Sequence, residues 1–292
     1  MNRRKFLLAG ALGFGGIGTI SSMQLNQFKQ QFDAETDVKM PVLFIGHGNP
    51  MNAINDNEFS RGWAEAGKLL SVPKAILCVS AHWLTKGTKV CAVEHPETIH
   101  DFSGFPQALF NVQYKAPGAP AFAAITKQLV TKTQIELDHE WGLDHGCWSV
   151  LNKMFPAANI PVYQLSIDYY QTPQYNYELA QQLKELRKKG VLIIGSGNIV
   201  HNLRLFQMKD IAYDWAIEFD SKIKELIEKG DHHPIINYKT LGKAAELSVP
   251  TNDHYLPLLY TLALQEKDEK ITFFNDKTTA GSISMTSLKI GS

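Results

Sequence analysis

Four short apolar runs constrain the fold of this chain more than any other feature of its sequence. They cover residues 41–45, 75–80, 160–166 and 191–196. Their hydrophobicity is continuous rather than alternating, which is typical of strands that are covered on both faces, as in parallel sheets. We therefore expect these runs to form the buried strands of a central sheet.

Helical patterns lie between the runs, at residues 57–70, 120–131, 175–189 and 213–229. The last two end in basic residues followed by Gly190 and Gly230, which are stop signals for a helix. Strands that alternate with helices predict an α/β domain whose central sheet, mostly parallel or mixed, is flanked by helices. In such folds, ligands bind beyond the carboxyl ends of the strands.

Composition and charge exclude several classes of protein. The 292 residues are 44% hydrophobic and 20% charged, which excludes a disordered, collagen-like or coiled-coil chain. Lys+Arg and Asp+Glu are equal at 29 each, so no net charge favours nucleic acid as a partner. Cys78, Cys91 and Cys147 are too few for a disulfide framework, and we expect them to be free buried thiols.

Several common catalytic motifs are missing from the sequence. It contains no GxGxxG after a strand and no Walker loop, so a nucleotide cofactor is not indicated. It contains no HExxH motif of zinc proteases, and residues 195–197 lack the flanking pattern of a nucleophile elbow.

The N-terminus has the features of an export signal. Arg3 and Arg4 precede an apolar run of about 15 residues, which is shorter than the roughly 20 residues of a membrane span. This pattern predicts a twin-arginine signal and linker over residues 1–39, with one large domain over 40–292. The expected partner is the twin-arginine export machinery and the expected location is the periplasm. A retained anchor facing the periplasm, or cytoplasmic residence if the signal is unused, stays open.

Five of the ten histidines stand where a metal site would form. His47, His82 and His201 follow predicted strands, while His145 and His254 lie in the segments WGLDHG and TNDHYLP. Each of them alone is more often a turn residue bonded to backbone. Together they indicate a metal site, because the carboxyl ends of parallel strands converge and imidazole is a preferred ligand of zinc and iron.

Six motifs carry a resemblance to a known family. In order they are GHGNPM (46–51), SAHW (80–83), IHDFSGFP (99–106), DHG (144–146), SGNIVHN (196–202) and HYLPLL (254–259). From about residue 40 to the C-terminus the chain resembles the DODA-type extradiol ring-cleavage dioxygenases, a branch of the class III, LigB-like superfamily. The resemblance implies one metal ion per chain, Fe(II) for activity or Zn²⁺ as the bound ion.

The resemblance also implies roles for individual residues. His47, His82 and His254 would bind the metal, and His201 would be either a fourth ligand or the acid/base histidine. His145 would contact the substrate. The third ligand position is His254, whereas Fe(II) oxygenases commonly use two histidines and a carboxylate.

The implied reaction opens a catechol-type, DOPA-like ring with O₂ to a muconic-semialdehyde-type product, with His201 as base and His145 as its helper. Candidate walls of the substrate pocket, each equally explained by core packing or an ordered loop, are Trp83, His100, Phe102, Phe105 and Tyr255. The alternatives are a zinc-dependent hydrolase that uses a metal-activated water, and a binding scaffold without activity. The oligomeric state is left open.

Overall fold

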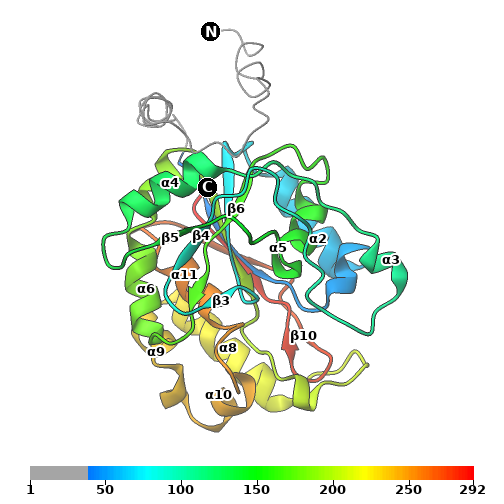
Figure 1. Cartoon of the computed structure of the whole chain (residues 1–292). Helices are drawn as coiled ribbons and strands as arrows, with labels where there is room; N and C mark the ends of the chain where they lie inside the picture. Colours follow the sequence, from blue (N-terminus) through cyan, green and yellow to red (C-terminus); the bar gives the residue numbers. More distant parts are fainter. Residues whose placement is uncertain (1–38) are drawn as a thin grey trace. The chain divides into compact units, whose positions relative to one another are not determined.

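A mixed six-stranded sheet with the order β6-β2-β8-β1-β12-β9 lies at the centre of the structure (Figure 1). The computed structural model describes residues 39–292. Its four parallel strands are β1 (Val42–Gly46), β2 (Ala75–Ser80), β6 (Val162–Gln164) and β8 (Val191–Gly197). Two antiparallel strands, β9 (Ile271–Phe274) and β12 (Ser287–Ile290), complete one edge. The prediction of an α/β domain with a mixed sheet is confirmed.

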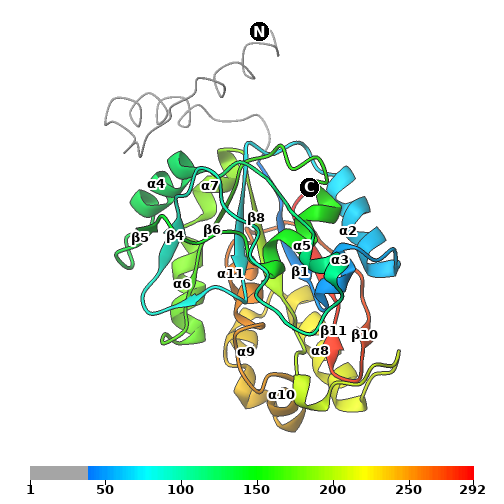
Figure 2. The same cartoon turned by 45° about the vertical axis from the view of Figure 1, so that its right-hand side comes forward.

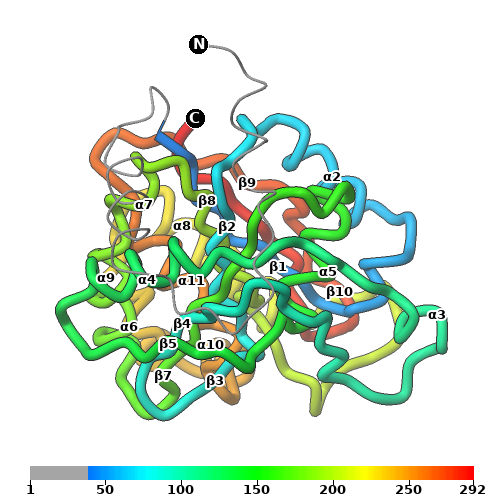
Figure 3. The backbone as a smooth tube through the Cα atoms, turned by 45° about the horizontal axis from the view of Figure 1, so that its top comes forward, coloured from blue at the N-terminus to red at the C-terminus, as the bar shows by residue number. Residues whose placement is uncertain are grey.

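Helices cover both faces of this sheet (Figure 2). On one face, α5 (His145–Met154) packs on β2 and β8, and α2 (Glu58–Lys68) packs on α5. On the other face, α11 (Leu256–Leu262) packs on β8 and β1, with α6 (Pro173–Gln181) against it. The view in Figure 3 shows β1, β8 and β2 between these two layers.

The remaining elements surround this three-layer centre. The helices are α3 (Gln107–Phe110), α4 (Pro120–Leu129), α7 (Lys184–Lys188), α8 (Asp214–Glu228), α9 (His232–Ile236) and α10 (Lys243–Ser248). Short 3-10 helices are η2 (Pro50–Ala53), η3 (Leu203–Leu205) and η4 (Tyr238–Leu241). Three strand pairs are β3 (Leu84–Thr85) with β7 (Ile167–Asp168), β4 (Lys89–Cys91) with β5 (Glu136–Asp138), and β10 (Thr278–Thr279) with β11 (Ile283–Ser284).

The predicted strands agree with the structure where the chain stays in the sheet. β2 matches its predicted run, and β1 and β8 differ from theirs by one residue at the ends. β6 is shorter than predicted. Pro161 has no N–H to donate to a neighbouring strand, and Leu165, which still donates to the Cys78 carbonyl, forms an isolated bridge with Val90.

The predicted helix over residues 175–189 is divided into α6 and α7. The fully buried Arg187 of α7 donates to the carbonyl oxygens of Met40 and Leu264 and pairs with Glu269, which ties this helix to other segments. The other three predicted helices form as α2, α4 and α8, and each ends within two residues of its predicted bounds.

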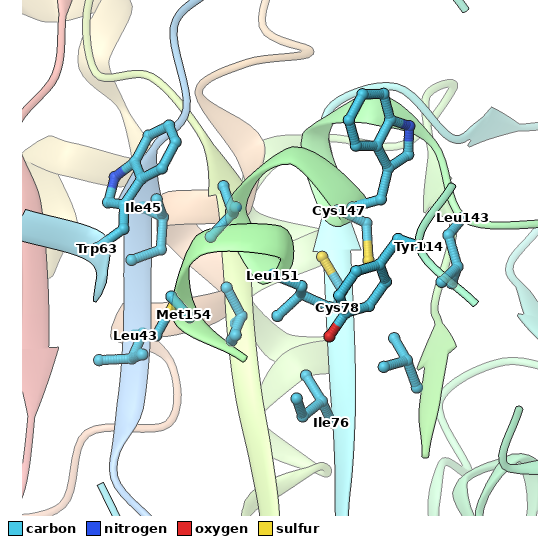
Figure 4. Packing of buried hydrophobic residues seen from close by; sticks show 14 of the residues in the cluster. Leu43, Ile45, Trp63, Ile76, Cys78, Tyr114, Leu143, Cys147, Leu151 and Met154 are labelled. Atoms are coloured by element: carbon cyan, nitrogen blue, oxygen red, sulfur yellow. The ribbon is translucent and has the colours of Figure 1, made fainter. Parts of the chain in front are cut away.

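A hydrophobic cluster fills the space between α2, α5 and the sheet (Figure 4). Trp63, Tyr114 and Trp148 are among its fully buried side chains. Cys78 of β2 and Cys147 of α5 point toward each other in this cluster. Both cysteines, and Cys91, are free and buried, which confirms the prediction.

The twin-arginine signal and linker were predicted over residues 1–39, and residues 1–38 of this stretch lie outside the described residues. Among the helices of residues 39–292, none combines the length and the apolar character that a membrane crossing requires.

Candidate metal centre and substrate cavity

Three histidines from distant parts of the chain meet beyond the carboxyl ends of the parallel strands β1 and β2, which flank β8. His47 directly follows β1, His82 follows β2, and His254 precedes α11. One nitrogen from each of the three lies within 4.8 Å of the other two. The ring centroids of the three histidines are 5.0 to 5.2 Å apart.

A serine fixes the tautomer of His47. The Ser196 hydroxyl donates its only hydrogen to the Gly146 carbonyl at 2.5 Å, so it accepts a hydrogen bond from His47 Nδ1 at 3.0 Å. His47 therefore carries its proton on Nδ1. The lone pair of Nε2 is left for a ligand.

Carboxylates lie beside the other two rings. His254 Nδ1 donates to Asp253 Oδ2 at 2.5 Å, which leaves the lone pair of that ring on Nε2. His82 Nδ1 lies 3.4 Å from Asp101 Oδ2, which already accepts from His145. Metal-binding histidines usually have their second nitrogen bonded to such a partner.

The donor set fits a divalent metal ion. The Nε2 atoms of His47 and His82 are 3.2 Å apart, a distance that suits a hydrogen bond when His82 carries its proton on Nε2 and two ligands of one ion when it does not. Metal–nitrogen bonds of about 2.0–2.1 Å in a tetrahedral site place neighbouring ligand atoms roughly 3.3–3.4 Å apart. These residues therefore fit the metal that the sequence leads us to expect.

Burial keeps the candidate ligands neutral. Burial, together with the neighbouring imidazoles, lowers the pKa of His47 and His254 well below the usual range. The same causes lower the pKa of His82 to about 3. Neutral imidazole is the form that binds a metal.

The buried Asp144 connects the end of β2 to the start of α5. Asp144 is the N-cap of α5 and accepts hydrogen bonds from the Ser80 hydroxyl at 2.6 Å and the Gln164 amide at 2.7 Å. Burial and the nearby Asp101 raise the pKa of Asp144. A Cβ at Gly146 would lie 2.5 Å from Ser80 Oγ, so only glycine permits this approach of α5 to β2.

A second glycine brings His254 to the end of β8. A Cβ at Gly197 would lie 2.1 Å from the His254 carbonyl oxygen. The same oxygen accepts a hydrogen bond from the Asn198 N–H at 2.8 Å. The close approach of the His254 backbone explains why the SGN segment has glycine at position 197.

His201 lies beside the three-histidine group without belonging to it. Its ring stacks on that of His254 with centroids 3.5 Å apart and planes within 8°. It is grouped by distance with Asp253 and His254. Burial lowers the pKa of His201 to about 4, against the opposing effect of Asp253.

Asp101 anchors His145, the first residue of α5. Its two oxygens accept hydrogen bonds from the backbone N–H and from Nδ1 of His145, both at 2.9 Å. Burial alone would raise the pKa of Asp101, but these bonds and the neighbouring histidines hold it below its usual range. Asp101 was not among the residues predicted from the IHDFSGFP motif, although a carboxylate beside His100 in that motif was the available signal.

A cavity of about 520 Å³ opens over these side chains. The histidines that line it are His82, His145, His201 and His254, beside Asp101. Its apolar lining consists of Pro50, Phe102, Phe105, Leu203, Phe206, Met208 and Ile283. Two of the predicted pocket residues, Phe102 and Phe105, thus line the cavity.

The structure places the other three predicted pocket residues elsewhere. Trp83 is buried and stacks on Trp141, with centroids 5.3 Å apart. The His100 ring packs against Trp148, 5.5 Å between centroids, and its Nε2 lies 3.1 Å from the Val112 carbonyl oxygen. Tyr255 is buried under α11, where its hydroxyl donates to the Ile235 carbonyl. Core packing, rather than the pocket, accounts for these rings.

Comparison with known proteins gives consistent matches over most of the chain. Residues 41–287 match the family described as the catalytic LigB subunit of aromatic ring-opening dioxygenase. The 4,5-DOPA dioxygenase extradiol of Escherichia coli (strain K12) is 45% identical over 262 residues, covering 88% of this chain and 96% of that protein. The protein of the same name from Beta vulgaris is 35% identical and covers 89% of this chain and 99% of its own length. The crystal structure of an uncharacterized protein from Escherichia coli K12 is similar at 40% identity and a TM-score of 0.74, covering 86% of this chain and 100% of that one.

Proposed function

This chain belongs to the LigB family of aromatic ring-opening dioxygenases and is an extradiol ring-cleavage enzyme, and from that premise we propose that it opens a catechol-type ring beside the three-histidine group. One observation carries the proposal of a site. Three imidazole lone pairs converge at one side of a cavity of about 520 Å³, which holds space for an aromatic ring.

His47, His82 and His254 would hold the metal ion. When bound, the ion supplies Lewis acidity toward the two catechol oxygens and electron transfer between ring and O₂. Fe(II) is the ion we propose for activity, because Zn²⁺ has no redox chemistry. An all-nitrogen ligand set also accommodates Zn²⁺, so zinc is the expected alternative occupant.

His201 is the proposed base for the substrate. Its low pKa keeps the ring neutral near pH 7, and its stacking on His254 places it next to the candidate ligands and on the cavity wall. A neutral imidazole in this position accepts a phenolic proton as the catechol binds. The same group, once protonated, returns the proton later in the reaction.

His145 is the proposed positioning residue for the substrate. Because Nδ1 donates to Asp101, Nε2 is the nitrogen that is left for the substrate, and the ring lines the cavity. It can accept a hydrogen bond from the second catechol hydroxyl. Cleavage next to the two hydroxyls would give a muconic-semialdehyde-type product. The names of the relatives make DOPA-like compounds the first class to assay.

Anaerobic reconstitution with Fe(II), followed by oxygen-electrode assays against a panel of catechols, tests this function. We expect O₂ uptake equal to the catechol consumed, together with a yellow ring-opened product, and no uptake by the Zn²⁺-loaded protein. Catechol-independent hydrolysis of esters or amides without O₂ uptake would instead identify a zinc hydrolase.

We also propose that the twin-arginine segment directs export to the periplasm. The support is the sequence alone, with Arg3 and Arg4 before a short apolar run. Fractionation of cells that express the full chain or its R3K/R4K variant tests this. Equal periplasmic amounts of the two forms would contradict twin-arginine export.

A further inference from the structure

The outer wall of the cavity is an apolar surface on one segment of the chain. Leu203, Phe206 and Met208 line the cavity from the segment after β8, and their exposed fractions are 65%, 38% and 94%. Exposed apolar surface of this kind is typical of a ligand-binding groove rather than of an ordinary loop. It lies next to Phe102 and Phe105, which come from the loop before α3.

Polar residues within and just after this apolar stretch anchor the segment. The Gln207 N–H donates to the Ala280 carbonyl at 2.9 Å, and its side-chain amide donates to the Tyr213 hydroxyl at 2.5 Å. Asp210 accepts from Lys277 at 2.8 Å and from Thr279 at 2.9 Å. The apolar side chains are therefore presented by a segment whose backbone is held in place.

The residues that line the cavity carry almost no formal charge. Among the described residues that line it, Asp101 is the only one with a formal charge, and no lysine or arginine is included. Both oxygens of Asp101 are engaged by His145. With the metal ion occupied by the two catechol oxygens, a carboxylate on the substrate would find no lysine or arginine in the lining, and an ammonium would find only a carboxylate that is already hydrogen-bonded.

The geometry thus points to a substrate class, given the catechol cleavage proposed above. The enzyme takes catechols with an uncharged, apolar substituent, such as alkyl- or arylcatechols, in preference to catechol amino acids, amines and acids. The dihydroxy edge faces the histidines, and the substituent lies against Leu203, Phe206 and Met208. Burying the substituent removes apolar surface from water, while a charged group in the same place loses its hydration without a partner.

A smaller neighbouring hollow is the alternative place for a charged substituent of the substrate. It has a volume of about 290 Å³ and shares His201, Leu203 and His254 with the main cavity. Arg204 and Asp253 both line it. A substrate carboxylate there would be attracted by Arg204 and repelled by Asp253, so the two effects oppose each other.

Matched pairs of ligands test the inference by binding, independently of turnover. Calorimetry with the Zn²⁺-loaded protein compares 4-propylcatechol with dopamine, which has an ammonium in place of the terminal methyl. It also compares 4-isobutylcatechol with 3,4-dihydroxyphenylacetate, in which a carboxylate replaces the branched end. We expect the apolar member to bind at least about tenfold more tightly in each pair, with up to about fourfold gained per buried methylene. Charged members that bind equally or more tightly overturn the inference.

Variants of the segment locate the effect. Met208→Lys should move the ratio of carboxylate to isobutyl binding toward the carboxylate by about fivefold to tenfold. Leu205→Lys adds the same charge to the same segment outside the cavity lining, and its ratio should stay within about twofold of the unaltered protein. If 3,4-dihydroxyphenylacetate binds best and Arg204→Gln alone removes that preference, the carboxylate is held in the smaller hollow and the inference is wrong.

The same ligands in the Fe(II) oxygen-electrode assay keep the two proposals apart. Turnover of every catechol with a preference for charged members refutes only the substrate class. Selective binding of alkylcatechols without O₂ uptake refutes the dioxygenase activity and supports the apolar site.

Discussion

The three-histidine group, which we call the floor of the cavity, and its outer wall at residues 203–208 are held by different kinds of interaction. On the floor, the three candidate metal ligands are buried or nearly so, and their second nitrogens face Ser196, Asp253 and Asp101. On the wall, apolar side chains of residues 203–208 make no directional bonds and stay exposed. Hydrogen bonds have strict geometry, whereas hydrophobic contacts do not. Changes on the floor should therefore act on metal and turnover, and changes on the wall on the choice of substrate.

The largest expected effect is on the floor. His82→Ala removes one of three converging lone pairs, so metal content, measured by elemental analysis after dialysis, should fall to background together with activity. Phe206→Ala is the matched change on the wall and should keep its metal. Equal metal content in His82→Ala and the unaltered protein would remove His82 from the ligand set.

His201 lies between the floor and the wall, and its replacement should separate turnover from binding. His201→Gln deletes the proposed base beside His254, and kcat should fall by about 10²–10⁴-fold. Metal content and the dissociation constant for a catechol should change little. A loss of metal as large as that of His82→Ala would show instead that His201 is a fourth ligand.

A smaller effect is expected from the residue that orients His47. Ser196→Ala removes the acceptor of His47 Nδ1 and should weaken metal affinity by about 10–100-fold, measured by competition with a chelator. Ser149→Ala is a suitable control, because the buried Ser149 hydroxyl has no hydrogen-bond partner among residues 39–292. Equal affinities in the two variants would show that Ser196 does not hold the ring.

The last expected effect concerns the stability of the metal-free protein and leaves turnover aside. In the unfolded chain, His82 and His201 bind protons near the ordinary histidine pKa of about 6.5, but in the folded chain their pKa values are lowered to about 3 and about 4. The free energy of unfolding should therefore fall as the pH decreases below about 6.5, by up to about 1.4 kcal/mol per pH unit for each histidine. Urea unfolding between pH 7 and pH 4.5 measures this slope. His201→Gln should reduce it, whereas Phe206→Ala should leave it unchanged.

The sequence was most informative where one physical cause dominates. Continuous apolar runs predicted β2 and β8, because a strand buried on both faces has to be apolar throughout. The common edge of parallel strands predicted that His47 and His82 would meet, whereas the family resemblance added His254 to them. β9 and β12 were missed, because antiparallel strands near an edge mix apolar with polar residues such as Thr272 and Lys289.

Partners that meet only in three dimensions were not predictable. Ser196 and Gly146 are 50 positions apart, and no local pattern shows that their hydrogen bond fixes the tautomer of His47. Trp83 and Tyr255 adjoin motif histidines, yet their rings point into the core, since neighbouring residues in sequence need not share a face. The apolar wall was missed because residues 203–208 lie in no regular strand, although four apolar residues among six are unusual for a loop.

The hydrogen bonds that hold the wall through Asp210 limit how the substrate preference of the enzyme can be engineered. Lys277 and Thr279, which donate to Asp210, lie at β10, far along the chain, so the wall depends on two separate stretches of sequence. If residues 203–211 alone were replaced by those of a relative, the residue at position 210 would have to fit Lys277 and Thr279 of this chain, with which it did not evolve. Exchanging residues 203–211 together with the β10 stretch should transfer a new substrate preference to this enzyme without changing the three candidate metal ligands.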